Sequence, residues 1–312
     1  MRAAGGTRIE WSDVPADVRH ATEVELGSPI VEARSQPGGF SPGVAARCVL
    51  ADGGRVFVKA VSPDQNPQSP RMHRREAEVA THLPTRTPAP RLLHVHDDGH
   101  WVVLVFEDVD GRQPHEPWTL ADLDVVMPAI KALGPAATPR DVAGLATVAD
   151  RHRSIFDGWR RFARGDGDPS LLPRWVASRI DELADVESRW EEAASGEELL
   201  HADLRADNVL IRVDRSVVFV DWPWACRGAG FVDPLMMLPS VGLGGGPDPG
   251  TVIDRYGLAD GVADADFLSV FVAVCGFFNR SSQDAPPPGL PALRTFQRAQ
   301  GAIGLEWLRS AV

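Results

Sequence analysis

The chain has 312 residues, of which 44% are hydrophobic and 24% charged, as in ordinary globular proteins. No apolar run approaches the roughly 18 residues that a membrane-spanning helix needs. The first residues lack the apolar core that is typical of a signal peptide. A net charge of −11 without a basic patch argues against a nucleic-acid-binding protein. We therefore expect a cytoplasmic protein with neither a nucleic acid nor a membrane as partner.

The cysteines and lysines of the chain indicate which kinds of site it can contain. Cys48, Cys226 and Cys275 lie far apart and none belongs to a C-x-x-C pair, so we predict buried free thiols instead of a zinc site or disulfides. Lys59 and Lys131 are the only lysines in a chain that otherwise uses arginine. Because an ammonium and a guanidinium are not interchangeable, a lysine inside an apolar run indicates a specific role.

The first 110 residues predict an antiparallel sheet with one inserted helix. The sequence Asp52-Gly53-Gly54 is typical of a hairpin turn, and a Pro- and Ser-rich stretch at 62–70 indicates a loop. In chain order we expect a helix at 14–26, strands at 29–35, 44–51 and 55–61, a helix at 71–83, and strands near 91–96 and 101–107.

After Gly111 the pattern becomes mainly helical. Pro- and Gly-rich loops are expected at 242–250 and 284–291. We predict helices at 119–133, 145–164, 174–194, 264–279 and 291–310, and two short strands at 208–212 and 216–221. A β-rich lobe followed by a helical lobe is an α+β arrangement. With the boundary near 108–117, we expect lobes at 1–110 and 111–312 and a ligand cleft between them.

The segment 200–221, LHADLRADNVLIRVDRSVVFVD, carries the strongest signal for chemistry. Its two apolar runs predict a hairpin around Asp214-Arg215, which would bring Asn208 and Asp221 side by side, with Asp203 just before the first strand. A few oxygen ligands of this kind suit Mg²⁺ that is held jointly with phosphates. The remaining carboxylate could then accept a hydroxyl proton.

This segment resembles the catalytic loop and metal-binding aspartate of the aminoglycoside phosphotransferase and choline kinase-like family, which has the protein-kinase-like fold. The family motif is H-G-D-x4-N; here Ala202 replaces the glycine, and Asp221-Trp222-Pro223 replaces the D-F-G of protein kinases. The resemblance implies an α+β, two-lobed enzyme that uses ATP and Mg²⁺. It also implies roles for five residues: Asp203 as catalytic base, Asn208 and Asp221 as metal ligands, and His201 and Asp233 as supports of the loop.

The N-terminal part offers an independent match to a kinase. Phosphoryl transfer by kinases uses a strand lysine that is braced by a helix glutamate. Lys59 lies in the predicted strand RVFVKAV; the alternative is an edge-strand lysine that faces water. By resemblance, Glu76 is its partner, although the helix also offers Glu78. The two glutamates point about 200° apart, so only one can face the cleft.

Two further nucleotide contacts follow from position. The loop 37–43, PGGFSPG, is neither a Walker A motif nor G-x-G-x-x-G, but it resembles the phosphate-covering loop of antibiotic kinases. Its small residues would let backbone N–H groups approach phosphate, with Gly39 and Ser41 as contacts, although a plain hairpin turn fits equally well. By resemblance, adenine would bond to the backbone of Glu107 and Val109 in the hinge at 106–111.

The sequence says least about which molecule accepts the phosphate. The loop and motif sequences resemble antibiotic O-phosphotransferases most, so a hydroxyl on an antibiotic-like small molecule is the first expectation. A metabolic kinase for choline, homoserine or a sugar is the alternative, and a nucleotide-binding pseudokinase a weaker one. Trp222 and Trp224 either line the acceptor pocket or belong to the core, and the acidic segment 181–198 either attracts a cationic substrate or faces water.

Overall fold

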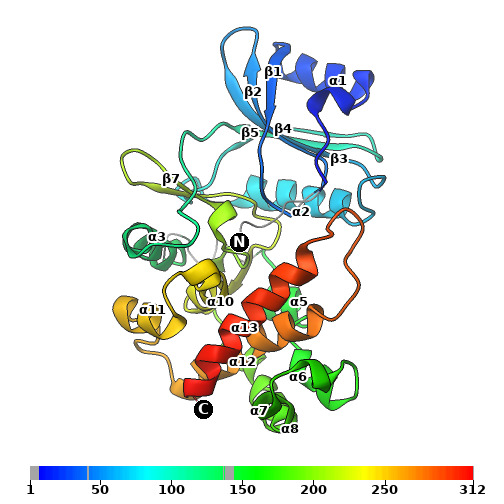
Figure 1. Ribbon diagram of the computed structural model, residues 1–312. Coiled ribbons are helices and arrows are strands. Elements are labelled where there is room, and N and C mark those ends of the chain that lie inside the picture. Colours follow the sequence, from blue (N-terminus) through cyan, green and yellow to red (C-terminus); the bar gives the residue numbers. More distant parts are fainter. Residues whose placement is uncertain (1–6, 41, 136, 138–143, 312) are drawn as a thin grey trace.

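The computed structural model describes residues 7–311 apart from 41, 136 and 138–143. Its β-rich N-terminal part and its larger helical C-terminal part form two lobes, one above the other (Figure 1). The predicted α+β, two-lobed fold is confirmed. Among the described residues, no helix is both long enough and apolar enough to cross a membrane.

The N-terminal lobe is a five-stranded antiparallel sheet in the order β1-β2-β3-β5-β4. The central strand β3 pairs with β2 and β5, and this register places Lys59 between Ala45 and Leu104. Lys59 is therefore an interior residue of the sheet, and the alternative of a water-facing edge lysine is wrong. The strands are β1 (Ile30–Ser35), β2 (Val44–Leu50), β3 (Arg55–Val61), β4 (Leu92–Asp97) and β5 (Val102–Glu107).

The two faces of this sheet carry different helices. One face packs with Trp11, Val14 and Val18 at the start of the chain and of helix α1 (Ala16–Leu26) into a closed apolar core. The other face contacts helix α2 (Ser69–His82) through a smaller cluster around Leu104. Helix α2 lies on the side of the sheet that faces the helical lobe (Figure 1), so one of its faces is directed toward the space between the lobes.

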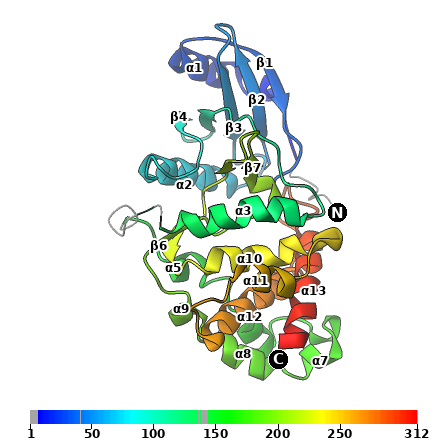
Figure 2. The ribbon, with the colours of Figure 1, turned by 90° about the vertical axis from the view of Figure 1, so that its left-hand side faces the viewer.

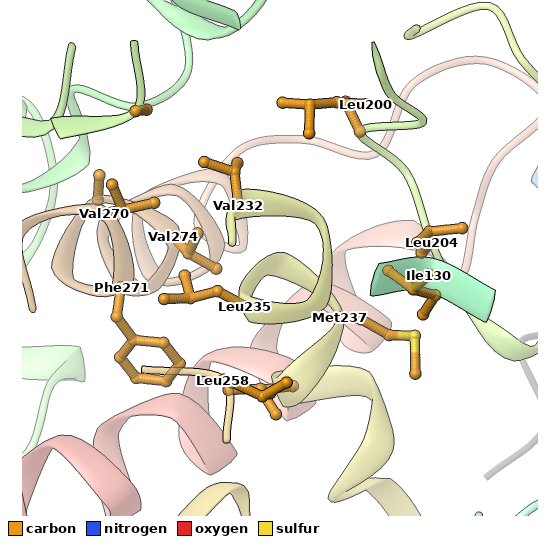
Figure 3. Packing of buried hydrophobic residues seen from close by; sticks show 14 of the residues in the cluster. Ile130, Leu200, Leu204, Val232, Leu235, Met237, Leu258, Val270, Phe271 and Val274 are labelled. Atoms are coloured by element: carbon orange, nitrogen blue, oxygen red, sulfur yellow. The ribbon is translucent and has the colours of Figure 1, made fainter. Parts of the chain in front are cut away.

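The helical lobe is held together by one large apolar core. Helix α10 (Val232–Val241) crosses its centre, where Leu235 and Met237 are completely buried. Leu235 lies toward Phe271 of helix α12 (Asp264–Ser281), and Met237 lies toward Ile130 (Figure 3). Helix α3 runs between this core and the N-terminal lobe (Figure 2). The remaining long helices are α3 (Leu120–Leu133), α12 (Asp264–Ser281) and α13 (Leu293–Ala311).

Two long predicted helices are wrong as continuous elements. The segment 145–164 contains α5 (Val148–His152) and α6 (Gly158–Ala163), separated by a bend. Gly158 lies against the backbone of Gly276 so closely that a Cβ would approach its carbonyl oxygen to 2.1 Å. This tertiary contact fixes where α6 begins. The segment 174–194 is likewise divided into α7 (Arg174–Ala177), α8 (Ile180–Glu187) and α9 (Trp190–Ala193).

Other elements were not predicted at all. The strands β6 (Glu198–Leu200) and β9 (Cys226–Gly228) pair with each other on either side of the catalytic segment. Helix α11 (Pro249–Tyr256) begins inside the predicted loop 242–250, with Asp248 as its cap. The predicted hairpin is present as β7 (Val209–Ile211) and β8 (Val217–Phe219), and the loop at 284–291 contains no helix or strand. The three cysteines are buried and free, as predicted.

Candidate functional site

A cavity of about 330 Å³ lies between the sheet and the β7–β8 hairpin. Every residue that was predicted to contact nucleotide or metal and that the structure describes lines this cavity. Asp203, the predicted base, does not line it. Ser41 falls outside the described residues. The predicted residues that line the cavity are Gly39, Lys59, Glu76, Glu107, Val109, Asn208 and Asp221.

Lys59 joins the two lobes at the inner end of this cavity. Its ammonium lies 2.6 and 2.8 Å from the two carboxylate oxygens of Glu76 and 2.8 Å from Oδ1 of Asp221. Burial raises the pKa of Glu76 to about 7, although the Lys59 ammonium opposes the shift. Burial also acts to raise the pKa of Asp221, but Lys59 and Arg205 outweigh it and hold that pKa well below its usual range. Asp221 is thus ionised at the point where the lobes meet.

The outer end of the cavity is formed by the connection between the lobes. Arg47 on β2 bonds to the carboxylate of Asp108 at 2.8 Å and also donates to the backbone carbonyl of Val109. The backbone N–H of Glu107 donates to the carbonyl of Arg91 at 3.0 Å. These bonds hold the segment that was predicted to contact adenine in one conformation along the cavity wall.

The glycine-rich loop covers the cavity from the sheet side. Gly38 and Gly39 adopt φ values of 94° and 73°, which side-chain-bearing residues rarely adopt. Arg8, in the segment before α1, donates to the carbonyl of Gly38 at 2.6 Å and lines the same cavity. The loop therefore brings backbone and a guanidinium group close to the predicted phosphate position.

The catalytic segment is held from below by Asp233, at the start of α10. Its two carboxylate oxygens accept the backbone N–H groups of His201 and Ala202, each at 2.7 Å. Burial raises the pKa of Asp233 to about 6, against the two backbone bonds. The His201 ring reaches the carbonyl of Val220 through Nε2 at 2.9 Å, which ties the loop to the strand before Asp221. Both residues thus hold the loop from outside the cavities.

Asp203 follows His201 and Ala202 in this loop and does not line the cavity that contains Lys59. The Asn208 amide donates to the Asp203 backbone carbonyl at 2.8 Å and approaches its side chain at 3.4 Å. Burial raises the pKa of Asp203 to about 7, opposed by Arg205 and supported by Asp221 and Asp207. A carboxylate with a pKa near neutrality suits a group that must accept a proton.

Arg205 is a candidate site residue that was not predicted from the sequence. Its guanidinium bonds both oxygens of Asp203, at 2.8 and 3.0 Å, and both oxygens of Asp207, at 3.0 and 3.1 Å. It also lies over the ring of Phe40 in the glycine-rich loop, 5.3 Å from the ring centre. The alternation Asp203, Arg205, Asp207 was visible in the sequence as a cation between two acids. Only the folded loop shows that all three side chains meet.

The donor set at Asn208 and Asp221 fits a magnesium ion that is shared with phosphates. The Asn208 amide nitrogen is engaged with Asp203, while its oxygen accepts no hydrogen bond from the described residues. Within the described residues no group of three or more His, Cys, Asp or Glu side chains could hold a metal alone. Magnesium is commonly bound by one or two protein oxygens together with substrate phosphates, and Asn208 and Asp221 could supply two such oxygens.

A second cavity, of about 370 Å³, adjoins the first. The two cavities share three lining residues: His73, Glu76 and Asp221. Asp203 and Arg205 line only the second cavity, whereas Lys59 and Asn208 line only the first. The site is therefore two chambers that meet at Asp221, one with the phosphate-binding features and the other with the candidate base. We call them the nucleotide chamber (cavity lined by Lys59 and Asn208) and the acceptor chamber (cavity lined by Asp203 and Arg205).

Solved structures similar to this one are antibiotic phosphotransferases. Macrolide 2'-phosphotransferase type I matches with a TM-score of 0.58 and 16% identity, over 96% of this chain and 97% of that chain. Aminoglycoside-3'-phosphotransferase of type VIII matches with a TM-score of 0.56 and 19% identity, over 83% and 99%. APH(3'')-Id from Streptomyces rimosus, solved with ADP and streptomycin, matches with a TM-score of 0.53 and 19% identity, over 83% and 97%. At these identities the similarity shows the protein-kinase-like fold.

Comparison of the sequence itself gives the family. A search of curated proteins finds no match. The model of the phosphotransferase enzyme family, APH, matches residues 39–270, which run from the glycine-rich loop through the catalytic segment to helix α12. Because this match spans well over half of the chain, the protein belongs to the phosphotransferase enzyme family.

Proposed function

We propose that this protein transfers the γ-phosphate of ATP to a hydroxyl group of an antibiotic-like small molecule. The observation that carries the proposal is the junction of two chambers at Asp221, with Lys59 on one side and Asp203 on the other. A donor and an acceptor that occupy these chambers would meet where charge must be neutralised. The structural neighbours solved with ADP and an antibiotic support the same use of the fold.

The nucleotide chamber supplies positive charge and oxygen ligands to the triphosphate. Lys59, held by Glu76, would contact the α- and β-phosphates, and the loop around Gly39 would cover them. Adenine would lie against the backbone of Glu107 and Val109. Asn208 and Asp221 would hold Mg²⁺, which neutralises charge on the phosphates.

Asp203 acts on the acceptor. From the floor of the acceptor chamber its carboxylate would orient the attacking hydroxyl and take its proton as the new P–O bond forms. Arg205, which bonds both Asp203 oxygens, would keep this carboxylate in place and lower the cost of charge in a buried site. Since phosphoryl transfer has a loose transition state, positioning and charge neutralisation would supply most of the rate enhancement.

The remaining assignments follow from this reaction. We place the boundary between the nucleotide-binding lobe, 1–110, and the catalytic and acceptor-binding lobe, 111–312, where Arg112 joins the backbone of Ile211. Use of ATP places the enzyme in the cytoplasm. An antibiotic as acceptor makes it a resistance kinase, in line with the antibiotic kinases that share its fold.

A transfer assay with γ-labelled ATP tests the proposal. The protein is incubated with MgATP and a panel of aminoglycosides, macrolides, nucleosides and metabolite alcohols, and labelled products are identified by mass spectrometry. We expect label on a hydroxyl of one class, no transfer without Mg²⁺, and none from Asp203→Asn protein. Tight MgATP binding without transfer to any acceptor, and without slow hydrolysis, would instead identify a pseudokinase.

A further inference from the structure

The acceptor chamber has an apolar wall that the reaction does not require. Helix α12 contributes Phe277 and Phe278, and α13 contributes Phe296. Trp224, just after the catalytic segment, and Ile155, between α5 and α6, complete this wall. Phe277, Phe278 and Phe296 are each only partly buried in the empty chamber, so a bound molecule could cover further apolar surface there. We call these five residues the apolar wall.

The charges of the chamber are confined to its junction with the nucleotide chamber. Of the described lining residues, only Glu76, Asp203, Arg205 and Asp221 have a carboxyl or guanidinium group, and all four lie close to the reaction centre. His73 lies at the same junction. His152, the other lining histidine, stays neutral near pH 7 because burial lowers its pKa to about 4. No described carboxylate faces the acceptor away from the reaction centre.

The acidic segment 181–198 lies away from the acceptor chamber, and some of its carboxylates are paired with arginines. In the segment 181–198, Glu187 is buried against Arg160, and Glu191 bonds Arg153 at 2.9 Å. None of the residues of 181–198 lines the acceptor chamber. Although the chain has a net charge of −11, no described carboxylate lies at the apolar wall, where a cationic acceptor would need one.

Besides the apolar wall, the chamber is lined by uncharged polar side chains, among them Asn66, Gln68, Ser69, Gln297 and Gln300. Gln300 on α13 is 3% exposed and lines the chamber, and it has no hydrogen-bond partner among the described residues. Its neighbour Gln297 also lines the chamber, but the Gln297 oxygen accepts a bond from Arg294 at 2.8 Å. Apolar pockets with one or two polar groups fix the orientation of a largely apolar ligand.

We propose that the acceptor is a bulky, largely apolar alcohol with at most one positive charge, oriented by Gln300, and that the chamber rejects polycationic aminosugars. This inference rests on the proposed function and specifies its substrate class. A polycation would lose the hydration of several ammonium groups against phenyl rings without gaining carboxylate partners away from the reaction centre, which is costly. An apolar alcohol would instead gain burial against the same rings at about 25 cal/mol per Å².

Calorimetry on the full chain saturated with MgADP tests the class. MgADP binding itself is measured first, and its absence would overturn the proposed function and not only the acceptor class. A macrolide, an ansamycin and a steroid alcohol are then compared with a polycationic aminoglycoside. We expect at least one apolar alcohol to bind on the order of 100-fold more tightly than the aminoglycoside. Equal or tighter binding of the aminoglycoside, or no binding by any apolar alcohol, would overturn the inference.

Two phenylalanines in the two chambers provide a matched pair of variants. Phe277 and Phe57 are both partly buried, and they line the acceptor and nucleotide chambers respectively. With the best apolar acceptor, Phe277→Ala should weaken acceptor binding by about tenfold and leave MgADP binding unchanged. Phe57→Ala should weaken MgADP binding and leave acceptor binding unchanged. Unchanged acceptor binding in folded Phe277→Ala protein would show that the apolar wall does not hold the acceptor.

The role of Gln300 is tested with a variant of the neighbouring Gln297 as control. Gln300→Leu should weaken binding of the preferred acceptor by about tenfold, because the acceptor loses a hydrogen bond inside the chamber. Gln297→Leu, which removes a bond to Arg294 instead, should have a smaller effect on acceptor binding. If the two variants weaken binding equally, or if Gln300→Leu tightens it, Gln300 does not orient the acceptor.

Discussion

The nucleotide chamber and the acceptor chamber differ in how they are built. In the nucleotide chamber, Lys59, Glu76, Asn208 and Asp221 are polar residues whose spacing is set by a strand, a helix and a hairpin. The apolar wall of the acceptor chamber consists of residues far apart in the chain, of which Ile155 is the first and Phe296 the last. The first is a set of short motifs joined at one salt-bridge cluster. The second exists only because four separate parts of the chain pack together.

This difference reflects the chemistry of the two substrates. A triphosphate has fixed charges in a fixed arrangement, so its binding site needs particular side chains at particular positions. An apolar acceptor is bound mainly by removal of surface from water, which any large apolar side chain can achieve. The catalytic loop lies where the chambers meet and must serve both. The experiments below separate the two chambers or test the loop between them.

The largest effect is expected at Asp203, the only candidate base at the junction. Asp203→Asn removes the proton acceptor but keeps the shape, so kcat should fall by about 10²–10⁴-fold. MgATP affinity, measured by calorimetry, should change little because Asp203 lines only the acceptor chamber. Asp214→Asn, at the exposed tip of the β7–β8 hairpin, is the matched control. Retention of normal kcat in Asp203→Asn protein would remove Asp203 from the role of base.

The two lysines test the nucleotide chamber. Lys59→Met removes the cation that contacts Glu76 and Asp221, and it should weaken MgATP binding by about 10–100-fold. Lys131→Met removes a lysine on α3 that, among the described residues, bonds only the carbonyl of Tyr256, at 3.0 Å, and should leave nucleotide affinity unchanged. Equal affinities for MgATP in the two variants would contradict the assignment of Lys59.

A smaller, pH-dependent effect is expected at His152, in the wall of the acceptor chamber. Burial lowers its pKa to about 4, so between pH 6.5 and 4 the unfolded chain binds a proton that the folded protein excludes. As pH falls through this window, the stability difference between wild type and His152→Phe should shift against the wild type by about 1.4 kcal/mol per pH unit. Chemical denaturation at pH 5 and pH 7 measures this. Above pH 6.5 the two proteins should respond to pH alike, and equal shifts at pH 5 would show that His152 is not buried in neutral form.

The smallest effect is expected at Ala202, where the chain departs from the family glycine. Ala202 has a φ of 62°, a left-handed conformation that costs an alanine about 1 kcal/mol. Ala202→Gly should therefore raise the free energy of unfolding by a similar amount. Ala206→Gly, in the short 3-10 helix of the same loop, should lower it. If denaturation shows both variants destabilised, the strain at Ala202 is compensated by its packing.

Most of the fold and the polar half of the site were readable from the sequence, because they rest on local patterns. Alternating apolar residues predicted β3 and the position of Lys59, and the turn Asp214-Arg215 predicted the hairpin that brings Asn208 to Asp221. The breaks in the helices at 145–164 and 174–194 could not be read, since they depend on close packing such as that of Gly158 on α12.

By itself the sequence determined which groups we propose for the chemistry, since acids, amides and a rare lysine have few other uses at those spacings. The tertiary structure alone decided that Arg205 bonds the catalytic carboxylate and that the acceptor chamber has an apolar wall. The physical reason is that the chemistry of a hydrogen-bonding group is given by its residue type, which the sequence shows. An apolar side chain can belong to the core or to a pocket, and which of the two it joins is decided only when distant segments pack.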